Sequence, residues 1–465
     1  MALVVLLAPA GNAAGPDSAY AQEQDRGYID WEMMGFTYSS WWDDEYLRPA
    51  SDATLDRMRA TGANWVSLNV TQYMDYADSN VIAPQTGGNT ASDAAIIEAI
   101  SDARARGMKV MLKPHVDVLR EDVWRGEITP SDKAAWFASY RQFINHYAEL
   151  SQRYGVDVLV VGSELASMSG GENYAEWQRT VAEVRARYSG KLTYSASLNE
   201  YGYACLWGWM DYLGFNFYFP LSESQDPPVE ELMRGWYDYN GRYSPANWLE
   251  RIRAWQAYWN KPVIFTEIGY RSILGTAVSP WDYWTPGVYS GQAQARAYEA
   301  AFRVLANEPY VIGAFWWNWT SGDIYRNPVN TEYSIAGKPA EAVVADWYTN
   351  RSSSAPRVQM DLSAVVWESY ENYRERRLSV FFSVSNGGGD TAREVQVMVS
   401  GASNNVSALS PTETMLGDIA AGSSMLYKVV YLVPQGTSSF RVNNYASCRD
   451  ASGTRFYFPV TPPAY

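Results

Sequence analysis

The feature that most constrains the fold of this chain is a repeated unit of one short strand-like run followed by one helix-like segment. The runs are rich in β-branched and aliphatic residues, as buried parallel strands are. Eight such runs occur: MMGFTYS from Met33, NWVSLNV from Asn64, KVMLKPH from Lys109, VDVLVVG from Val156, KLTYSAS from Lys191, YLGFNFY from Tyr212, PVIFTEI from Pro262 and VIGAFWW from Val311. Eight units within about 325 residues predict an α/β fold, a closed (β/α)8 TIM barrel over residues 27–350.

The segments between these runs carry apolar residues at helical spacing, and several open on Ser, Asp or Pro and close on Gly. They include SDATLDRMRATG, SDAAIIEAISDARARG, PSDKAAWFASYRQFINHYAELSQRYG, NYAEWQRTVAEVRARYSG, SPANWLERIRAWQAYW and SGQAQARAYEAAFRVLAN. The link after the fifth run, YGYACLWGWM, is the weakest helix. An open doubly wound sheet is the alternative, but it normally has fewer strands, and no G-x-G-x-x-G or G-x-x-x-x-G-K-[ST] motif follows any run.

The sequence changes character after Tyr348. Residues 351–357 are Ser-rich and predict a linker, while residues 358–465 alternate apolar and polar residues between turn signals such as NGGGD. This pattern predicts a small C-terminal all-β, sandwich-like domain. The module either binds polysaccharide or cell wall, or acts as a packing or spacer element, and the second role is favoured.

The N-terminus resembles a secretory signal. Residues 1–26 hold a short apolar run followed by small residues, although no basic residue precedes the run. We therefore expect a secreted or cell-surface protein with a leader at 1–26. No stretch is long and apolar enough to predict a membrane span. Cys205 and Cys448 could pair in an oxidising compartment, but two buried free thiols are favoured.

Composition narrows the class of partner. The chain has 51 acidic and 37 basic residues and a net charge of -14, without a Lys/Arg run, which argues against nucleic acid as a partner. The 20 Trp and 35 Tyr suit ligands with apolar C–H faces and many hydroxyls, such as an oligosaccharide or polysaccharide. With two His and no metal-binding motif, we expect neither metal nor cofactor. We also expect a monomer.

Two carboxylates occupy equivalent places in the repeat. Glu164 directly follows the fourth run, and Glu267 lies at the end of the seventh. The carboxyl ends of barrel strands surround the active-site mouth, so the two side chains should face one another there. Glycoside hydrolysis needs such a pair, one carboxyl group protonated to assist the leaving oxygen and the other ionised. A salt bridge at the barrel rim is the alternative for either residue alone.

The chain resembles the clan A glycoside hydrolases, and more narrowly glycoside hydrolase family 113, the β-mannanases. The resemblance lies in GFTYSSWW, GANWVSLNVTQY, GMKVMLKPHVDV, VVGSEL and PVIFTEIGYRS, and it covers about Gly35 to Tyr348. It implies that Glu164 is the acid/base and Glu267 the nucleophile. Much of the clan has Asn before the acid/base, where this chain has Ser163, so contact with the sugar 2-hydroxyl is expected to pass to Ser163 or another residue.

Further residues are expected to bind substrate. Strand periodicity places Lys113, His115 and Asp117 on one side of the third run, and Asn216 and Tyr218 on one face of the sixth. The resemblance suggests that His115 and Asp117 bind the sugar next to the cut and that Tyr218 donates to the nucleophile. One Trp of each pair after the first and eighth strands should face the mouth. The full expected set is Trp42, Asn69, His115, Asp117, Ser163, Asn199, Asn216, Tyr218, Trp316 and Trp317.

The sequence thus predicts a retaining glycoside hydrolase, with endo-β-1,4-mannanase as the first hypothesis. An exo-acting β-mannosidase or a β-glucanase remains open within the same class, because recognition of the sugar O2 configuration is not readable from these motifs. From another class, a catalytically silent sugar-binding or cell-wall scaffold protein also remains open.

Overall fold

The computed structural model describes residues 29–242, 246–323, 326–349, 356–402, 406–411, 413–437, 440, 442–451 and 455–459. The predicted leader at 1–26 and most of the predicted linker at 351–357 lie outside these residues. The chain divides into two compact units, one holding Asp30–Phe302 and Glu308–Asn350 and the other holding Arg351–Tyr465.

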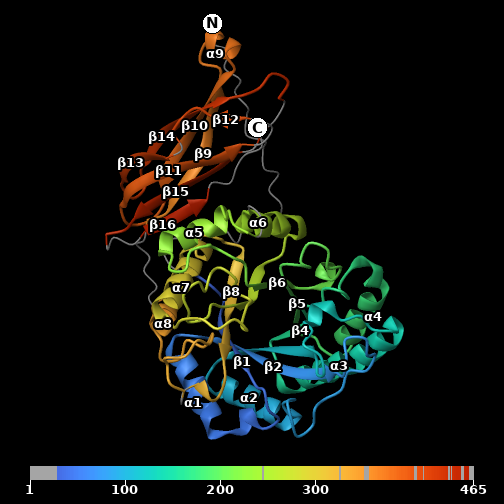
Figure 1. Cartoon of the computed structure of the whole chain (residues 1–465). Coiled ribbons are helices and arrows are strands. Elements are labelled where there is room, and N and C mark those ends of the chain that lie inside the picture. The colour runs from blue at the N-terminus through green and yellow to red at the C-terminus, as the bar shows by residue number, and fades with distance from the viewer. Residues whose placement is uncertain are drawn as a thin grey trace. The chain divides into compact units, whose positions relative to one another are not determined.

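The first unit is a closed barrel of eight parallel strands in sequential order, with β8 pairing β1 (Figure 1). This confirms the predicted (β/α)8 fold. The strands are β1 Met33–Ser39, β2 Trp65–Met74, β3 Lys109–Val118, β4 Val158–Ser163, β5 Lys191–Ala196, β6 Tyr212–Phe217, β7 Val263–Ile268 and β8 Val311–Trp319.

Helices surround the barrel: α1 Pro49–Ala60, α2 Asp93–Ala105, α3 Lys133–Tyr154, α4 Tyr174–Arg185, α5 Val229–Tyr237, α6 Trp248–Trp259, α7 Gly291–Leu305 and α8 Pro339–Thr349. Side-chain caps fix several of their starts. Ser92, Asp132 and Asn247 each accept a hydrogen bond from the backbone N–H three residues on, which satisfies a donor that the first helical turn leaves free.

Two connections depart from a simple repeat. Within the described residues, the weak segment between β5 and β6 forms only the short 3-10 helix η5, Trp207–Trp209. Between β6 and β7 the chain forms two helices, α5 and α6, of which the sequence analysis identified only α6. The helix α5 begins after Pro228, and a Pro just before a short segment is a weak signal for a helix.

The second unit contains two four-stranded antiparallel sheets, with strand orders β12-β14-β10-β9 and β13-β11-β15-β16. A shared core that includes Val380, Val429, Val397 and Ala446 draws residues from both sheets, as in a sandwich. The elements are β9 Val358–Val366, α9 Tyr370–Arg374, β10 Arg377–Asn386, β11 Ala392–Ala402, β12 Ser407–Ala408, β13 Glu413–Ile419, β14 Ser424–Leu432, β15 Val442–Arg449 and β16 Arg455–Pro459. Cys448 is buried in this core, whereas Cys205 in the barrel unit is half-buried.

Packing inside the barrel sets the height of the site. A layer that includes Met33, Trp65, Met111 and Phe315 fills the interior. Side chains two residues apart on a strand share a face, so Lys113 lies on the inward face one layer above Met111. The polar interior therefore begins at Lys113, at the carboxyl ends of the strands.

The seam that closes the barrel depends on a glycine. Gly313 of β8 is opposite Met33 of β1, and a Cβ at Gly313 would lie 2.3 Å from the Met33 Cβ and 2.5 Å from its carbonyl oxygen. We expect Gly313→Ala to lower the free energy of unfolding by about 1 to 3 kcal/mol, the usual range for overpacking. Gly202→Ala, where nothing lies within 4 Å of the added Cβ, is the control. Equal urea midpoints for the two variants would contradict this account of the seam.

Candidate active site

Glu164 and Glu267 lie at the carboxyl ends of β4 and β7. Glu267 is the last residue but one of β7 and is buried. Glu164 directly follows β4 and is half-buried. Both are thus at the same end of the barrel, where the loops after the strands surround a mouth.

Glu267 is held by a cation and a phenol. Its Oε1 accepts a hydrogen bond from the Lys113 ammonium, and its Oε2 accepts one of 2.8 Å from the Tyr218 hydroxyl. Burial raises the pKa of Glu267, while Lys113 opposes that shift by favouring the ionised form. Burial likewise lowers the pKa of Lys113, and Glu267 opposes that change.

Glu164 is held by neutral donors. Its Oε1 accepts from the Asn216 amide at 2.9 Å, and its Oε2 accepts from the Trp124 indole N–H at 3.1 Å. Its backbone has a φ of 54°, in the left-handed region that non-glycine residues rarely adopt. Such strain is commonly found at functional positions, where surrounding contacts hold it in place.

Asn216 joins the two carboxylates. Its amide nitrogen donates to Glu164, while its Oδ1 accepts from Lys113 at 3.3 Å and from Ser195 at 2.7 Å. An irregularity in the pairing of β6 with β7 places Asn216 opposite Glu267 in the register. Lys113 and Asn216 therefore form a polar bridge between the acid on β7 and the acid after β4.

The loop between β3 and α3 contributes two residues that the sequence analysis missed. Besides Trp124, it supplies Arg125, whose Nε donates to Asp117 Oδ1 at 2.8 Å. Arg125 begins the short 3-10 helix η3, Arg125–Glu127, and its charge acts on both Glu164 and Glu267. A W-R pair in a loop has no periodicity, so no sequence signal singled it out.

Three expected sugar-binding residues lie buried close to this network. In the described part of the chain, both polar side-chain atoms of Asn69, both ring nitrogens of His115 and the hydroxyl of Ser163 have no hydrogen-bond partner. His115 Nε2 lies 3.9 Å from Glu267 Oε1, and Asn69 is opposite Lys113 in the β2–β3 register. Burial lowers the pKa of His115 well below its usual value, so the ring is neutral.

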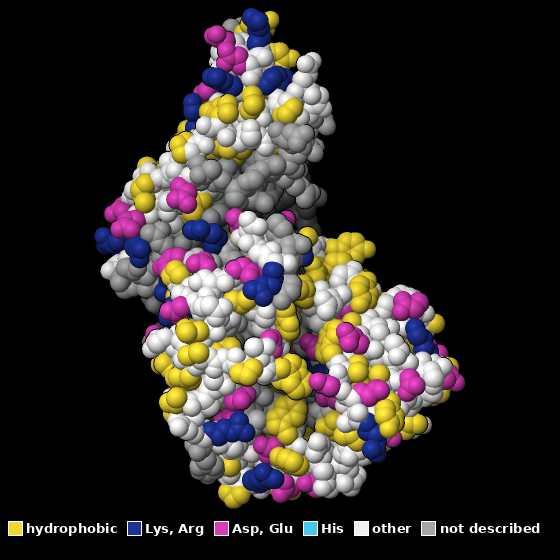
Figure 2. Space-filling model, viewed as in Figure 1, with side chains coloured by type: hydrophobic (Ala, Val, Ile, Leu, Met, Phe, Trp, Pro, Cys, Tyr) yellow, Lys and Arg dark blue, Asp and Glu magenta, His cyan; other side chains and the backbone are white. Residues whose placement is uncertain are grey.

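The neighbouring tryptophans Trp316 and Trp317 of β8 lie in different surroundings, because successive side chains on a strand point to opposite faces. Trp316 is buried, stacked on Tyr298 of α7 with ring centroids 4.3 Å apart. This position corrects the assignment of Trp316 to the substrate site, because its face is covered by the helix. Its neighbour Trp317 is half-buried and lies edge-on to the exposed Trp41, and Trp42 is also exposed. On the face shown in Figure 2, hydrophobic side chains gather along the middle of the barrel unit.

The segment after β5 holds one exposed candidate and one buried carboxylate. Asn199 is exposed in a turn. The neighbouring carboxylate Glu200 is fully buried and accepts hydrogen bonds from Tyr194, Ser169 and the Ser197 N–H. The Tyr194 hydroxyl in turn accepts from the Leu165 N–H, directly after Glu164. Glu200 therefore supports the backbone of the Glu164 turn through Tyr194.

Glu200 also predicts a pH dependence of stability. Burial raises its pKa from 4.5 to about 7, so the folded protein holds a proton that the unfolded chain releases. This contribution to stability is present at low pH and is lost as pH rises from about 4.5 to 7. Relative to Glu200→Gln, which cannot titrate, the wild type should lose about 2 to 3 kcal/mol of unfolding free energy over that range. Urea unfolding at several pH values measures the difference, and a pH-independent difference would show that the pKa of Glu200 is the same in the folded and unfolded states.

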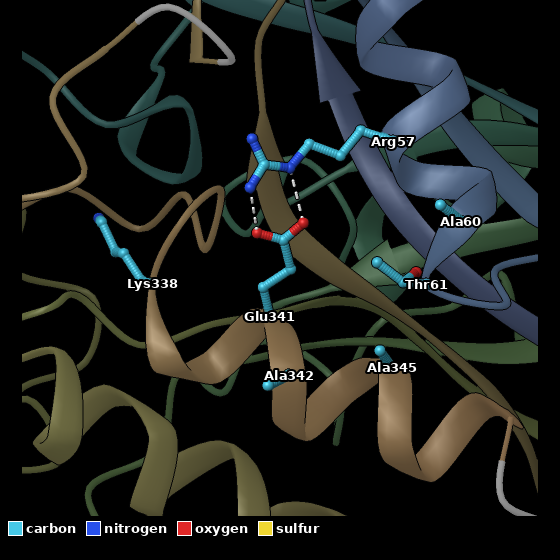
Figure 3. A pocket seen from close by; sticks show the side chains of 7 residues that line it. All are labelled: Arg57, Ala60, Thr61, Lys338, Glu341, Ala342 and Ala345. Atoms are coloured by element: carbon cyan, nitrogen blue, oxygen red, sulfur yellow. Dashed lines mark hydrogen bonds and ion pairs between the residues drawn. The ribbon is translucent and has the colours of Figure 1, made fainter.

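A hollow of about 340 Å³ lies elsewhere, between α1 and α8 (Figure 3). In it Glu341 makes two hydrogen bonds of 2.7 Å with Arg57, and Lys338 points away from this pair. None of the residues lining the hollow contacts Glu164 or Glu267, so we do not assign it to the site. Among the described residues, no group of three or more His, Cys, Asp or Glu could hold a metal ion, and no helix could cross a membrane.

Comparison with known proteins identifies the family. The sequence model of Glycoside Hydrolase Family 113 matches residues 34–338. The chain belongs to glycoside hydrolase family 113. It is therefore a glycoside hydrolase that acts on a carbohydrate substrate. No curated protein matches the chain.

Solved structures of family 113 enzymes resemble the barrel. One, described as a complex of a β-1,4-mannanase, is 25% identical, with a TM-score of 0.60, covering 69% of this chain and 99% of the other. The β-mannanase AaManA from Alicyclobacillus acidocaldarius, solved in complex with ManMIm, is 28% identical, with a TM-score of 0.60 and coverage of 68% and 97%. The shared part is the barrel, since the family match ends before the β module.

Proposed function

We propose that this glycoside hydrolase is a retaining endo-β-1,4-mannanase in which Glu267 is the nucleophile and Glu164 the acid/base. The observation that carries the proposal is the difference between the two carboxylates. Glu267 is bound by the Lys113 ammonium, which favours its ionised form, whereas the hydrogen bonds to Glu164 come from the neutral groups of Asn216 and Trp124. A nucleophile must be ionised, and an acid/base must alternate between its two forms.

The chemistry follows from these positions. A Glu267 oxygen attacks the anomeric carbon while Glu164 donates its proton to the leaving oxygen, so the glycosidic C–O bond breaks as the glycosyl-enzyme bond forms. In the second step Glu164, now ionised, takes a proton from water. The water oxygen attacks the same carbon and releases Glu267 as a carboxylate. The two inversions restore the β configuration.

Support for mannan as substrate comes from the similar structures, one described as a β-1,4-mannanase and the other as a β-mannanase. The exposed Trp41, which lies edge-on to Trp317, and the exposed Trp42 suit stacking on pyranose rings. For Ser163 we propose contact with the sugar 2-hydroxyl, since its buried hydroxyl has no partner within the described residues. We further propose secretion, from the signal-like N-terminal sequence.

The roles of the two acids make their variants fail differently. Glu267→Ala should lose nearly all activity on every substrate, because no covalent intermediate can form. Glu164→Ala should hydrolyse mannan very slowly, yet retain the first step on an aryl β-mannoside whose phenolate leaves without protonation. Added azide should then speed turnover and yield a β-mannosyl azide, because a small anion needs no general base.

Product analysis of the azide reaction by NMR checks the assignment, with Glu149→Gln, which changes an exposed carboxylate of α3, as the control. Equal loss of activity in both site variants on the aryl mannoside, without an azide product, would show that Glu164 is not the acid/base. An α-mannosyl azide would indicate an inverting reaction and overturn the mechanism.

The products of hydrolysis test whether the enzyme cleaves within the chain or at its end. Mannan and mannohexaose should give mixed short oligomers from the start of the reaction, because an endo enzyme binds sugars on both sides of the cut. Mannose alone would indicate an exo-acting β-mannosidase, and preference for a glucan over mannan would overturn the substrate assignment. Absence of hydrolysis of any of these glycans would instead favour a sugar-binding protein without activity.

A further inference from the structure

The loop between β7 and α7, residues 269–290, presents a pair of exposed aromatic rings. Tyr283 is 58% exposed and Trp284 is 63% exposed. Their ring centroids are 4.2 Å apart at an interplanar angle of 32°, so the two side chains form one continuous aromatic surface. Large aromatic side chains held together in solvent are unusual unless they meet a ligand.

The backbone under this pair is firmly held. Asp282 Oδ1 accepts hydrogen bonds from the Trp284 N–H at 3.0 Å and from the Thr285 N–H at 2.9 Å. The buried Arg271 donates to the carbonyl oxygens of Asp282 and Thr285 at 3.1 Å and 2.7 Å. The aromatic surface is thus exposed, but its backbone is fixed by these four hydrogen bonds within its own loop, so little backbone freedom remains to be lost when a ligand binds.

Contacts connect this loop to the proposed nucleophile. The Tyr333 hydroxyl donates to the carbonyl oxygen of Pro280, and the Tyr333 ring lies edge-on to Tyr218 with centroids 6.2 Å apart. Tyr218 is the residue that donates to Glu267. The loop is therefore connected to Glu267 through the side chains of Tyr333 and Tyr218.

Tyr283 also interacts electrostatically with charged residues at the end of β3 and in the loop that follows it. Burial and the charges of Asp122 and Asp117 raise the pKa of Tyr283, and the charge of Arg125 acts on it in the opposite direction. All three charged residues belong to the end of β3 and the loop that follows, which also supplies Trp124 to Glu164. Tyr283 thus lies within range of the charges on the loop whose Trp124 donates to the proposed acid/base.

We propose that Tyr283 and Trp284 form a sugar-stacking subsite for a pyranose unit at least one residue beyond the cleaved bond. The groups around the carboxylates, Lys113, Asn216 and Tyr218, are hydrogen-bonding groups suited to the sugar at the cut, whereas the aromatic pair offers a flat apolar face. The inference rests on the proposed mannanase function and deepens it by assigning binding of longer chains to this loop.

The test compares substrates of different length. For the double variant Tyr283→Ala/Trp284→Ala, kcat/KM on mannohexaose should fall by about 10-fold, mainly through KM, as for loss of an anchoring aromatic contact. Turnover of an aryl β-mannoside, which has one sugar, should stay unchanged and shows that the variant is folded. Tyr258→Ala removes another exposed aromatic, 74% exposed on the outer helix α6, and is the matched control.

Asp282→Ala provides a second variant, which keeps both rings but removes the hydrogen bonds that fix their backbone. It should raise KM for mannohexaose in the same direction, by a smaller factor. An equal change on mannohexaose and on the aryl mannoside, or no change on either, would overturn the subsite while leaving the mannanase proposal intact. Wild-type protein that turns over neither substrate would overturn the mannanase function and the subsite with it.

Discussion

The site depends on one buried ion pair inside the barrel. Lys113 is fully buried, and its ammonium reaches from β3 to Glu267 on β7 and to Asn216 on β6. Removing either charge from water is costly, and each offsets part of the cost for the other only because they are in contact. Replacing one member alone would leave an uncompensated buried charge. The pair therefore couples the position of the proposed nucleophile to the integrity of the barrel interior.

This ion pair also explains how the two glutamates of one site can have different surroundings and different proposed roles. Burial favours the neutral form of the Glu267 carboxyl group, and the nearby charge of Glu164 raises the pKa of Glu267 further. At Glu267 a cation and a phenol hydrogen bond oppose that tendency. The Glu164 side chain is closer to solvent and bonds only neutral donors, while the charge of Arg125 acts on it from a distance. The two environments suit the two roles that the proposed double displacement requires.

The strand pattern made the fold predictable, because a period of two within short runs and helical spacing between them are direct consequences of burial on both faces. The same regularity located Glu164 and Glu267 at strand ends and placed Lys113 beside His115. The strand pattern could not show which of Trp316 and Trp317 faces the mouth. The direction of each side chain depends on how β8 pairs with β1, and that pairing shifts register near Phe36. The strand pattern also gave no sign that Glu200 turns inward, since a turn residue has no periodic neighbour from which its direction can be read.

The positions of loop residues could not be predicted from the sequence either, because loops have no periodic pattern. Trp124, Arg125, Tyr283 and Trp284 follow no strand or helix pattern, and only the folded loops bring them to the mouth. The barrel fixes the atoms that break the bond, because strands hold side chains rigidly relative to one another. The loops after β3 and β7 determine what lies beside those atoms, and they can change without disturbing the strands. Selection of a carbohydrate by length is therefore expected to reside in these loops, whereas the chemistry resides in the strand ends.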